Sequence, residues 1–171
     1  MKRCTRCLYD ESLPNITFDE NGVCNYCHIH DQLNHEYPTG EEGMKKLRAI
    51  ADQIRKDGRG KQYDVVVGVS VGADSSYMIY LAKELGLRPL AVHFDNTWNS
   101  TVATENIHDV LKKLDVDLWT YVVDNKEYDD IYRSFLKAGV PDTEAPTDIG
   151  LAAVLNMACE KFGVKYIFEG H

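Results

Sequence analysis

The sequence predicts an α/β domain with a parallel sheet and helices on both of its faces, preceded by a short cysteine-rich segment. From residue 63 onward, short β-branched runs alternate with longer segments whose apolar residues recur at helical spacing. Strands that alternate with helices form right-handed βαβ units around a parallel sheet. The first thirty residues differ, because they hold four of the five cysteines and few apolar side chains.

The order of elements follows from the apolar pattern and the glycines. Gly86, Gly139 and Gly163 each follow a helical pattern, the position where glycine closes a helix. Upstream, residues 31–40 read as a polar linker, and a helix runs from Met44 to Ile54. We divide the chain into a cysteine-rich segment (1–35), a linker with a helix (36–62) and the α/β domain (63–171). The predicted strands are 63–69, 88–94, 118–123 and 164–168, and the predicted helices are 74–85, 101–114, 125–138 and 147–162.

The charge of the chain bears on its partners. The formal charge is −8, and residues 63–171 supply all of it. A domain that binds nucleic-acid phosphates is normally basic, so a small or protein-borne substrate is favoured over nucleic acid. The N-terminus does not resemble a signal peptide, and no apolar stretch approaches the roughly 20 residues of a membrane span. We therefore expect a cytoplasmic protein with reduced cysteines and no membrane contact.

Two C-x2-C pairs, separated by sixteen residues, predict a metal site at Cys4, Cys7, Cys24 and Cys27. Four thiolates complete a closed tetrahedron around Zn²⁺, which makes the site structural, and metal binding supplies folding free energy to a segment poor in apolar residues. An iron–sulfur cluster is the main alternative. A c-type haem site at Cys24–His28 would require export, for which the sequence has no signal. We expect a zinc ribbon, with His28 and His30 as spectators and Cys159 as a core thiol.

The segment after the first predicted strand has the composition of a phosphate-binding loop. It opens a helix, whose N-terminus offers unpaired N–H groups and the positive end of the helix dipole. Simple capping by Asp74, Ser75 or Ser76 is the alternative, but it leaves Ser70 and Gly72 unexplained. The loop is not a Walker loop, because the GK[ST] element is absent. The predicted phosphate ligands are Ser70, Val71, Gly72, Ala73, Asp74 and Ser75.

The loop resembles the SGGxDS signature of the PP-loop ATP pyrophosphatases, with matches at Ser70, Gly72, Asp74 and Ser75. The resemblance implies cleavage of ATP between its α and β phosphates, transfer of AMP to a carbonyl oxygen, and displacement of AMP by a nucleophile. It also implies Mg²⁺, a catalytic part for Asp74, and adenosine binding at the end of the second strand. The residues implied there are His93, Phe94 and Asp95, although Asp95 also fits a strand-ending turn.

Val71 departs from this signature, which has glycine at that position. A β-branched side chain is costly where the backbone must approach a ligand closely or adopt a positive φ. The departure is consistent with weakened ATP binding, with an engineered substitution or with a divergent loop. If the steric argument holds, Val71→Gly tightens ATP binding.

The order of zinc ribbon, helix and PP-loop domain, with the segment His93–Ser100, resembles the N-acetyl sugar amidotransferases of bacterial surface-polysaccharide and flagellin-glycan pathways. The resemblance covers nearly the whole chain and implies ATP, Mg²⁺ and structural Zn²⁺ as cofactors. It implies adenylation of the acetamido carbonyl of a nucleotide-linked or nonulosonic sugar, after which ammonia from a separate glutaminase subunit displaces AMP. Gly170 and His171 match the start of a second motif, so we expect the natural chain to continue, and the activity of this portion alone stays open.

Two alternatives remain. A tRNA-thiolating PP-loop enzyme often has lysine at the position of Ala73 and a pair of catalytic cysteines, whereas only Cys159 follows the loop here. A non-catalytic nucleotide-binding or zinc-mediated interaction module is the other, and Val71 gives it weight.

Overall fold

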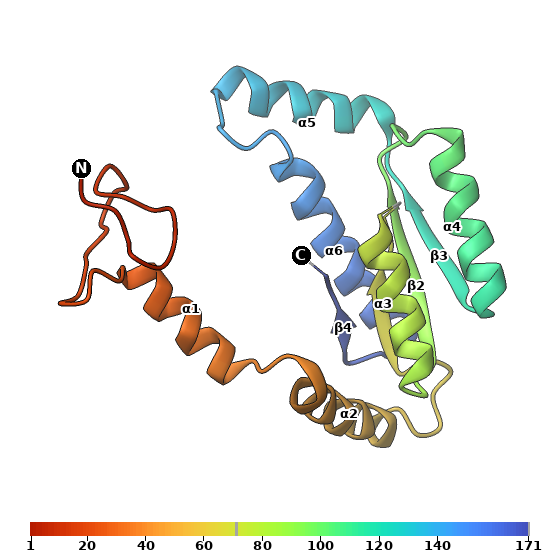
Figure 1. Cartoon of the computed structure of the whole chain (residues 1–171). Coiled ribbons are helices and arrows are strands. Elements are labelled where there is room, and N and C mark those ends of the chain that lie inside the picture. Colours follow the sequence, from red (N-terminus) through yellow and green to blue (C-terminus); the bar gives the residue numbers. More distant parts are fainter. Residues whose placement is uncertain (71, 171) are drawn as a thin grey trace. The chain divides into compact units, whose positions relative to one another are not determined.

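The protein is described by a computed structural model that covers residues 1–70 and 72–170. The chain forms two compact units, residues 1–49 and 50–171, and Figure 1 shows their helices and strands coloured along the sequence. Each unit is described by itself. No helix in these two described ranges has both the length and the apolar character that crossing a membrane requires.

The first unit has little regular structure before its helices. Two isolated antiparallel bridges join Arg3 to Asp10 and Phe18 to Cys24. Helix α1 (Asn25–Glu36) follows, and α2 (Gly40–Asp57) begins in this unit and ends in the second. The linker predicted over residues 31–40 is therefore wrong in its first part. Most of these residues are polar, but polarity alone does not end a helix, and the first proline of this range is Pro38.

The second unit is built on a four-stranded parallel sheet in the order β3-β2-β1-β4, which confirms the predicted fold class. The strands are β1 (Val65–Gly68), β2 (Pro89–Asp95), β3 (Asp117–Val122) and β4 (Ile167–Phe168). The last strand is shorter than predicted. The Val164 N–H donates to the Cys159 carbonyl at 2.9 Å, so this residue belongs to the turn that closes α6.

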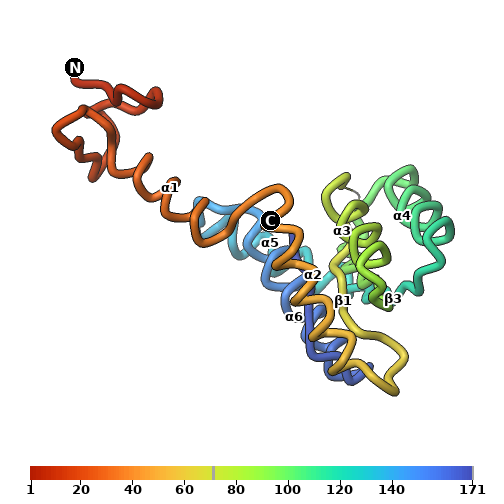
Figure 2. The backbone as a smooth tube through the Cα atoms, turned by 60° about the horizontal axis from the view of Figure 1, so that its bottom comes forward, coloured from red at the N-terminus to blue at the C-terminus, as the bar shows by residue number. Residues whose placement is uncertain are grey.

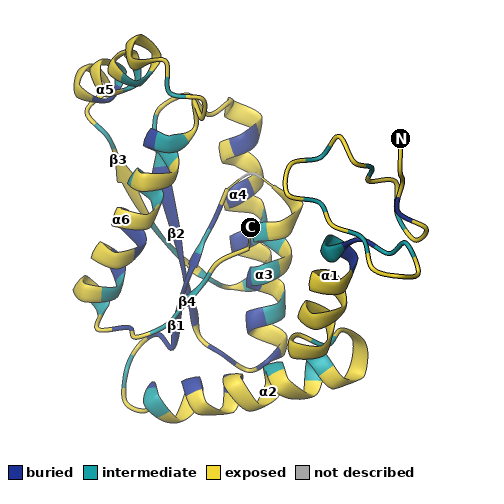
Figure 3. Cartoon of the chain, turned by 90° about the vertical axis from the view of Figure 1, so that its left-hand side faces the viewer, coloured by how far each residue is buried: buried dark blue, intermediate teal, exposed yellow. Residues whose placement is uncertain are grey.

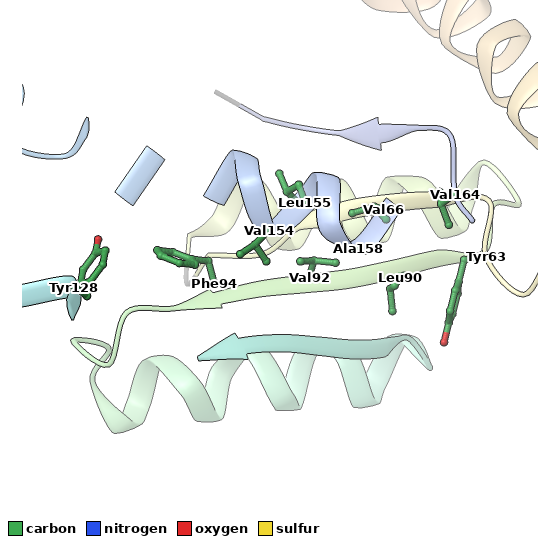
Figure 4. Close-up of a cluster of buried hydrophobic side chains, with 10 residues drawn as sticks. All are labelled: Tyr63, Val66, Leu90, Val92, Phe94, Tyr128, Val154, Leu155, Ala158 and Val164. Carbon is green, nitrogen blue, oxygen red and sulfur yellow. The ribbon is translucent and has the colours of Figure 1, made fainter. Parts of the chain in front are cut away.

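Helices cover both faces of this sheet. Helix α6 (Ala145–Phe162) packs on one face, where Val154, Leu155 and Ala158 meet Val66 and Val92 of the strands (Figure 4). Helix α3 (Ala73–Glu84) contacts β1 and β2, with α4 (Thr101–Leu114) against it. In the turned view of Figure 2, α6 and the pair α3 and α4 lie on opposite sides of β1.

The central strands form the core because they are covered on both faces. Val65, Val66 and Val67 are fully buried although neighbouring side chains of a strand point to opposite faces. Figure 3 shows this as continuous dark blue along β1 and β2. Helix α5 (Asn125–Ala138) contacts α6 and completes the unit. This three-layer arrangement of helices, sheet and helices supports the loops at the carboxyl edge of the sheet.

Candidate functional site

A cavity of about 360 Å³ lies at the carboxyl edge of the sheet. In parallel α/β sheets ligands bind at this edge, where the strand order reverses, as it does here between β1 and its two neighbours. Side chains come to the cavity from the loops after β1 and β2, from the first turns of α6 and from the segment after β4. The lining includes Ser70, Ser75, His93, Phe94, Asn96, Asn99, Thr147, Asp148, Glu169 and Gly170.

Two serines shape the predicted phosphate loop. The Ser75 hydroxyl accepts from the Ser70 N–H at 3.2 Å and donates to the Ser70 carbonyl at 3.0 Å. The Ser70 hydroxyl accepts from the Gly72 N–H at 3.3 Å. These bonds hold both serines at the cavity, as the sequence predicts. Val71 lies outside the described residues.

The remaining predicted loop residues lie at the start of α3. Gly72 is its N-cap, with φ −74° and ψ 157°, and within the described residues no side chain caps this N-terminus. Its first-turn N–H groups thus remain available to an anion. Ala73 and Asp74 follow and are exposed, and neither lines the cavity. The catalytic part suggested for Asp74 stays a prediction.

The end of β2 contributes His93 and Phe94, both buried and both in the cavity wall. Asp95 has a different environment, since its carboxylate accepts from the Thr97 N–H at 2.8 Å and does not line the cavity. This is the strand-ending turn that the sequence offered as the alternative for Asp95. Asn96 and Asn99 also line the cavity, although the sequence had placed them only within the motif that follows the second strand and not among the predicted site residues. Two amide side chains directly after a strand of a parallel sheet are the signal that marks them.

The first turns of α6 form the opposite wall, which the sequence analysis missed because it placed the helix start at residue 147. The helix begins at Ala145, and no described side chain caps it. Thr147 and Asp148 therefore reach the cavity from its first turn. A Cβ on Gly150 would lie 2.6 Å from Cζ of Phe94, so glycine permits the close contact between α6 and the end of β2.

The arrangement suits a polyphosphate with a divalent cation. Two helix N-termini without side-chain caps, those of α3 and α6, border one cavity and present the positive ends of their dipoles. The helices α4 and α5 differ, because Ser100 and Asp124 cap them through hydrogen bonds to first-turn N–H groups. The carboxylates of Asp148 and Glu169 line the same cavity. Carboxylate and phosphate oxygens together are the donors that Mg²⁺ takes in nucleotide sites.

The first unit brings its four predicted ligands together. The Sγ atoms of Cys4, Cys7, Cys24 and Cys27 lie within 4.8 Å of one another, with 3.9 Å between Cys4 and Cys27 and 3.7 Å between Cys7 and Cys24. Tetrahedral bonds of roughly 2.3 Å require Sγ atoms about 3.8 Å apart, so the cluster fits a single metal ion. In an iron–sulfur cubane each thiolate binds a different iron, which sets the sulfurs farther apart.

The histidines of this unit have other partners. Nε2 of His28 lies 2.9 Å from the Asp19 carboxylate, and Nδ1 of His30 lies 3.1 Å from the Asn34 amide. The four-ligand set among the described residues thus consists of thiols, as expected.

The pKa values of two of these thiols are shifted in opposite directions from the usual value of a cysteine. Burial raises the pKa of Cys4, but the backbone N–H groups of Arg6, Cys7 and Cys24 outweigh it and bring the pKa to about 6. Burial and the neighbouring sulfurs raise the pKa of Cys27 to about 12. A metal ion must therefore displace protons from this cluster, and its affinity falls as the pH falls.

Comparison with known proteins gives two groups of relatives. No family model matches the chain. An uncharacterised protein of Methanocaldococcus jannaschii is 30% identical over 172 residues, 99% of this chain and 58% of that protein. The tRNA-specific 2-thiouridylase MnmA of Colwellia psychrerythraea is 34% identical over 125 residues, 65% of this chain and 33% of that protein. The chain thus spans little more than half of one relative and a third of the other.

Solved structures share the fold at low sequence identity. The NH3-dependent NAD synthetase of Campylobacter jejuni aligns with a TM-score of 0.52 and 16% identity over 74% of this chain and 56% of that one. The glutamine-dependent NAD+ synthetase of Acinetobacter baumannii, solved with ADP, gives 0.56 and 18% over 71% of this chain and 23% of that one. The shared fold and the similarity to MnmA together support placing this chain in the PP-loop ATP pyrophosphatase superfamily of ATP-using enzymes.

Proposed function

We propose that the second unit binds ATP in the cavity at the carboxyl edge of the sheet and transfers AMP to a carbonyl oxygen of its substrate. The observation that carries this proposal is the pairing of two helix N-termini without side-chain caps, at α3 and α6, around one cavity. Backbone N–H groups at the start of α3 stabilise phosphate charge without reorganising during the reaction. At α6 the contribution is the helix dipole, because Pro146 has no N–H and the N–H groups of Thr147 and Asp148 donate to the Glu144 carbonyl. Ser70 and Ser75 line the same place, and the Ser75 hydroxyl fixes the loop through its bonds to the backbone of Ser70.

We assign different parts of the cavity wall to different parts of ATP. Ser70, Ser75 and the N-terminus of α3 hold the phosphates, and the end of β2 with Phe94 faces the adenosine. We assign Mg²⁺ to Asp148 and Glu169, which line the cavity, and the ion would neutralise charge as pyrophosphate leaves. Asp74 and Asp95 lie close by in sequence but outside the cavity lining, so we give them a supporting part.

For the substrate, we propose the acetamido group of an N-acetyl sugar, nucleotide-linked or nonulosonic. An amide carbonyl is a poor electrophile, and AMP on its oxygen is a good leaving group that ammonia can displace to give an acetamidino group. The segment His93–Ser100 and the four-cysteine module carry this proposal, together with the acidic charge of residues 63–171. Ammonia is scarce at neutral pH, so a separate glutaminase subunit supplies it, and the cysteine module holds Zn²⁺ as a structural ion.

Thiolation of tRNA is the second candidate, because of the 34% identity to MnmA. That chemistry needs a reactive cysteine as the sulfur carrier. Among the described residues only Cys159 lies outside the four-cysteine cluster, and it sits in α6 packed against the hydrophobic core. Burial raises the pKa of Cys159, which disfavours the thiolate that attacks sulfur. This portion of the protein therefore favours amidotransfer.

Release of pyrophosphate and AMP from ATP by the full-length protein tests both candidates. We expect release that requires an acetamido sugar and ammonia. Release that requires tRNA and a sulfur donor would reject amidotransfer and retain adenylation. Absence of pyrophosphate with either substrate would contradict the proposed function. Ser75→Ala should reduce release about tenfold, because it removes the two hydrogen bonds that tie the Ser70 backbone to the start of α3. Ser134→Ala is the matched control, because Ser134 is exposed on α5.

A further inference from the structure

His93 stands out because a buried imidazole uses both of its nitrogens inside the protein. His93 is only 6% exposed and lies near the carboxyl end of β2. Nδ1 lies 3.0 Å from the Val69 carbonyl oxygen, and Nε2 lies 3.3 Å from the amide nitrogen of Asn99. A carbonyl oxygen only accepts a hydrogen bond, and an amide nitrogen only donates. These partners require a neutral ring that carries its proton on Nδ1.

The orientation of the Asn99 amide has independent support. Its nitrogen also lies 3.5 Å from Oδ1 of Asp95, which accepts from the Thr97 N–H. A flipped amide would turn its oxygen toward this carboxylate and lose the contact. The amide nitrogen therefore faces both Asp95 and His93, and Nε2 of the ring is the acceptor.

On its Nδ1 side, the His93 ring contacts Val69, the residue that leads into the phosphate loop. Val69 lies between the end of β1 and Ser70, where the ladder of backbone hydrogen bonds stops. Its N–H donates to the Val92 carbonyl at 2.9 Å, and its carbonyl accepts from the His93 ring. Both backbone polar groups of Val69 are thus tied to β2. The next residue, Ser70, makes the loop-shaping bonds to Ser75.

On its Nε2 side, the His93 ring contacts Asn99, in the loop that follows β2. Asn99 lines the cavity, and so does the neighbouring Asn96, whose side chain accepts from the Trp98 N–H at 3.1 Å. One ring therefore joins the two loops that form adjoining walls of the cavity. With both nitrogens occupied in this way, His93 has no polar atom left for adenosine.

We propose that His93 is a positioning residue of the nucleotide site, which links the phosphate loop to the loop at Asn96–Asn99 through its neutral Nδ1–H form. The consequence for nucleotide binding rests on the proposed function, whereas the form of the ring does not. His93→Asn keeps a donor near the Nδ1 position and loses the acceptor toward Asn99. His93→Gln keeps an acceptor near the Nε2 position and loses the donor toward Val69.

The first test is the imidazole ¹⁵N spectrum of the histidine-labelled chain at mildly alkaline pH. We expect His93 to be neutral with the proton on Nδ1, in slow exchange, whereas exposed His108 exchanges between forms. A proton on Nε2, or a doubly protonated ring, would overturn the proposal. This measurement uses the unaltered protein and decides the matter even if a variant fails to fold.

The second test is calorimetric titration with inorganic pyrophosphate and with ATP, each with Mg²⁺. His93→Gln should weaken pyrophosphate binding about tenfold, the loss expected for one hydrogen bond to a loop that carries charge-assisted contacts. His93→Asn should leave pyrophosphate binding within about twofold and weaken ATP more strongly. His108→Asn is the matched control and should change neither.

Equal affinities in folded His93 variants and the His108 control would overturn the positioning role while ATP binding itself stands. If the unaltered protein binds neither pyrophosphate nor ATP, the proposed function fails instead, and the ¹⁵N spectrum still decides the form of the ring.

Discussion

At the scale of single residues, Asp64 is a buried carboxylate that joins the starts of β1 and β2. Its side chain is 2% exposed and accepts from the backbone N–H of Arg88 at 2.9 Å and from Nε of the same residue at 3.0 Å. The hydrogen bonds from Arg88 to this carboxylate raise the pKa of the guanidinium group further. The pair fixes the register of the two central strands at the edge opposite the cavity.

Asp64→Ala should lower the free energy of unfolding by about 2 kcal/mol. Removing one partner of a buried pair costs more than this in general, but the Arg88 side chain is 49% exposed and can regain water. Urea denaturation measures the loss. Asp130→Ala removes an exposed carboxylate paired with Arg133 and should cost at most about 0.5 kcal/mol. Equal losses in the two variants would contradict the importance given to burial.

Gly150→Ala tests the close contact between α6 and Phe94. Alanine normally favours a helix interior over glycine by about 1 kcal/mol. Here the added Cβ would lie 2.6 Å from the Phe94 ring, which must move, so we expect stability to fall by about 1 kcal/mol and ATP binding to weaken. Ala153→Gly, at an exposed position of the same helix, should lower stability by a similar amount and leave ATP binding unchanged. A Gly150→Ala protein that is more stable and binds ATP normally would refute this account.

Individual site residues were predictable from the sequence where a local motif carries them. Ser70, Gly72 and Ser75 follow directly from the strand, loop and helix pattern. The hydrogen bond between His93 and Asn99 could not be predicted from the sequence, because it depends on how the chain turns after β2. Sequence spacing does not reveal that a strand residue and a loop residue six positions later face each other.

At the scale of elements, the helix N-termini divide into two kinds. The Ser100 hydroxyl accepts from the Ala103 N–H at 3.2 Å, and the Asp124 carboxylate accepts from two N–H groups at 3.0 Å. The N-termini of α3 and α6 begin without such a side chain in the described ranges, and these are the two at the cavity. Helix α1 also begins without a side-chain cap, at Cys24 of the cysteine cluster, so it is the position of α3 and α6 at the cavity that sets their N-termini apart.

Gly72→Asp should separate stability from binding. An aspartate at this N-cap satisfies N–H groups of α3, so the free energy of unfolding should rise by a few tenths of a kcal/mol. Its charge occupies the phosphate position, so pyrophosphate affinity should fall well over about tenfold. Asp124→Ser exchanges one cap for another on α5 and should change neither quantity much. Chemical denaturation and calorimetry measure the two effects.

Undiminished pyrophosphate binding by Gly72→Asp would show that the start of α3 is not the phosphate site.

The element boundaries themselves were predictable from the sequence where end signals are strong. Helices α4 and α5 begin and end where predicted, because a capping residue precedes each and Gly139 closes α5. The start of β4 and the whole of α1 were not, because turn closure leaves little trace in composition and Cys27 is the one buried residue of α1.

At the scale of the whole molecule, the two units differ in what holds them together. The second unit has buried hydrophobic residues on both faces of its sheet, including a cluster between α6 and the strands. The core of the first unit is Cys4, Cys24 and Cys27 themselves, with partly buried Ile16 and Phe18 beside them. If these thiols bind the proposed metal ion, folding of the first unit depends on it.

Removing the metal should therefore unfold the first unit alone. With a chelator, we expect amide signals of residues 1–36 to lose dispersion while those of β1 and β2 persist. Acid should act in the same direction, since protonation of thiolates releases the metal as the pH falls.

Elemental analysis should find one Zn²⁺ per chain, unchanged in Cys159→Ser and lost in Cys24→Ser. Iron in place of zinc, or a folded first unit without metal, would contradict this.

Binding of Mg²⁺ and ATP, followed in the amide spectrum of the labelled chain, tests the central claim most directly. The account predicts saturable shifts at the phosphate loop, at the turn after β2 and at the first turn of α6, with residues 1–36 unaffected. Ser75→Ala should weaken this binding at least about tenfold, whereas Ser134→Ala should not. An unchanged spectrum at saturating ATP, or shifts confined to residues away from Ser70, Ser75 and Thr147, would contradict a nucleotide site at this edge of the sheet.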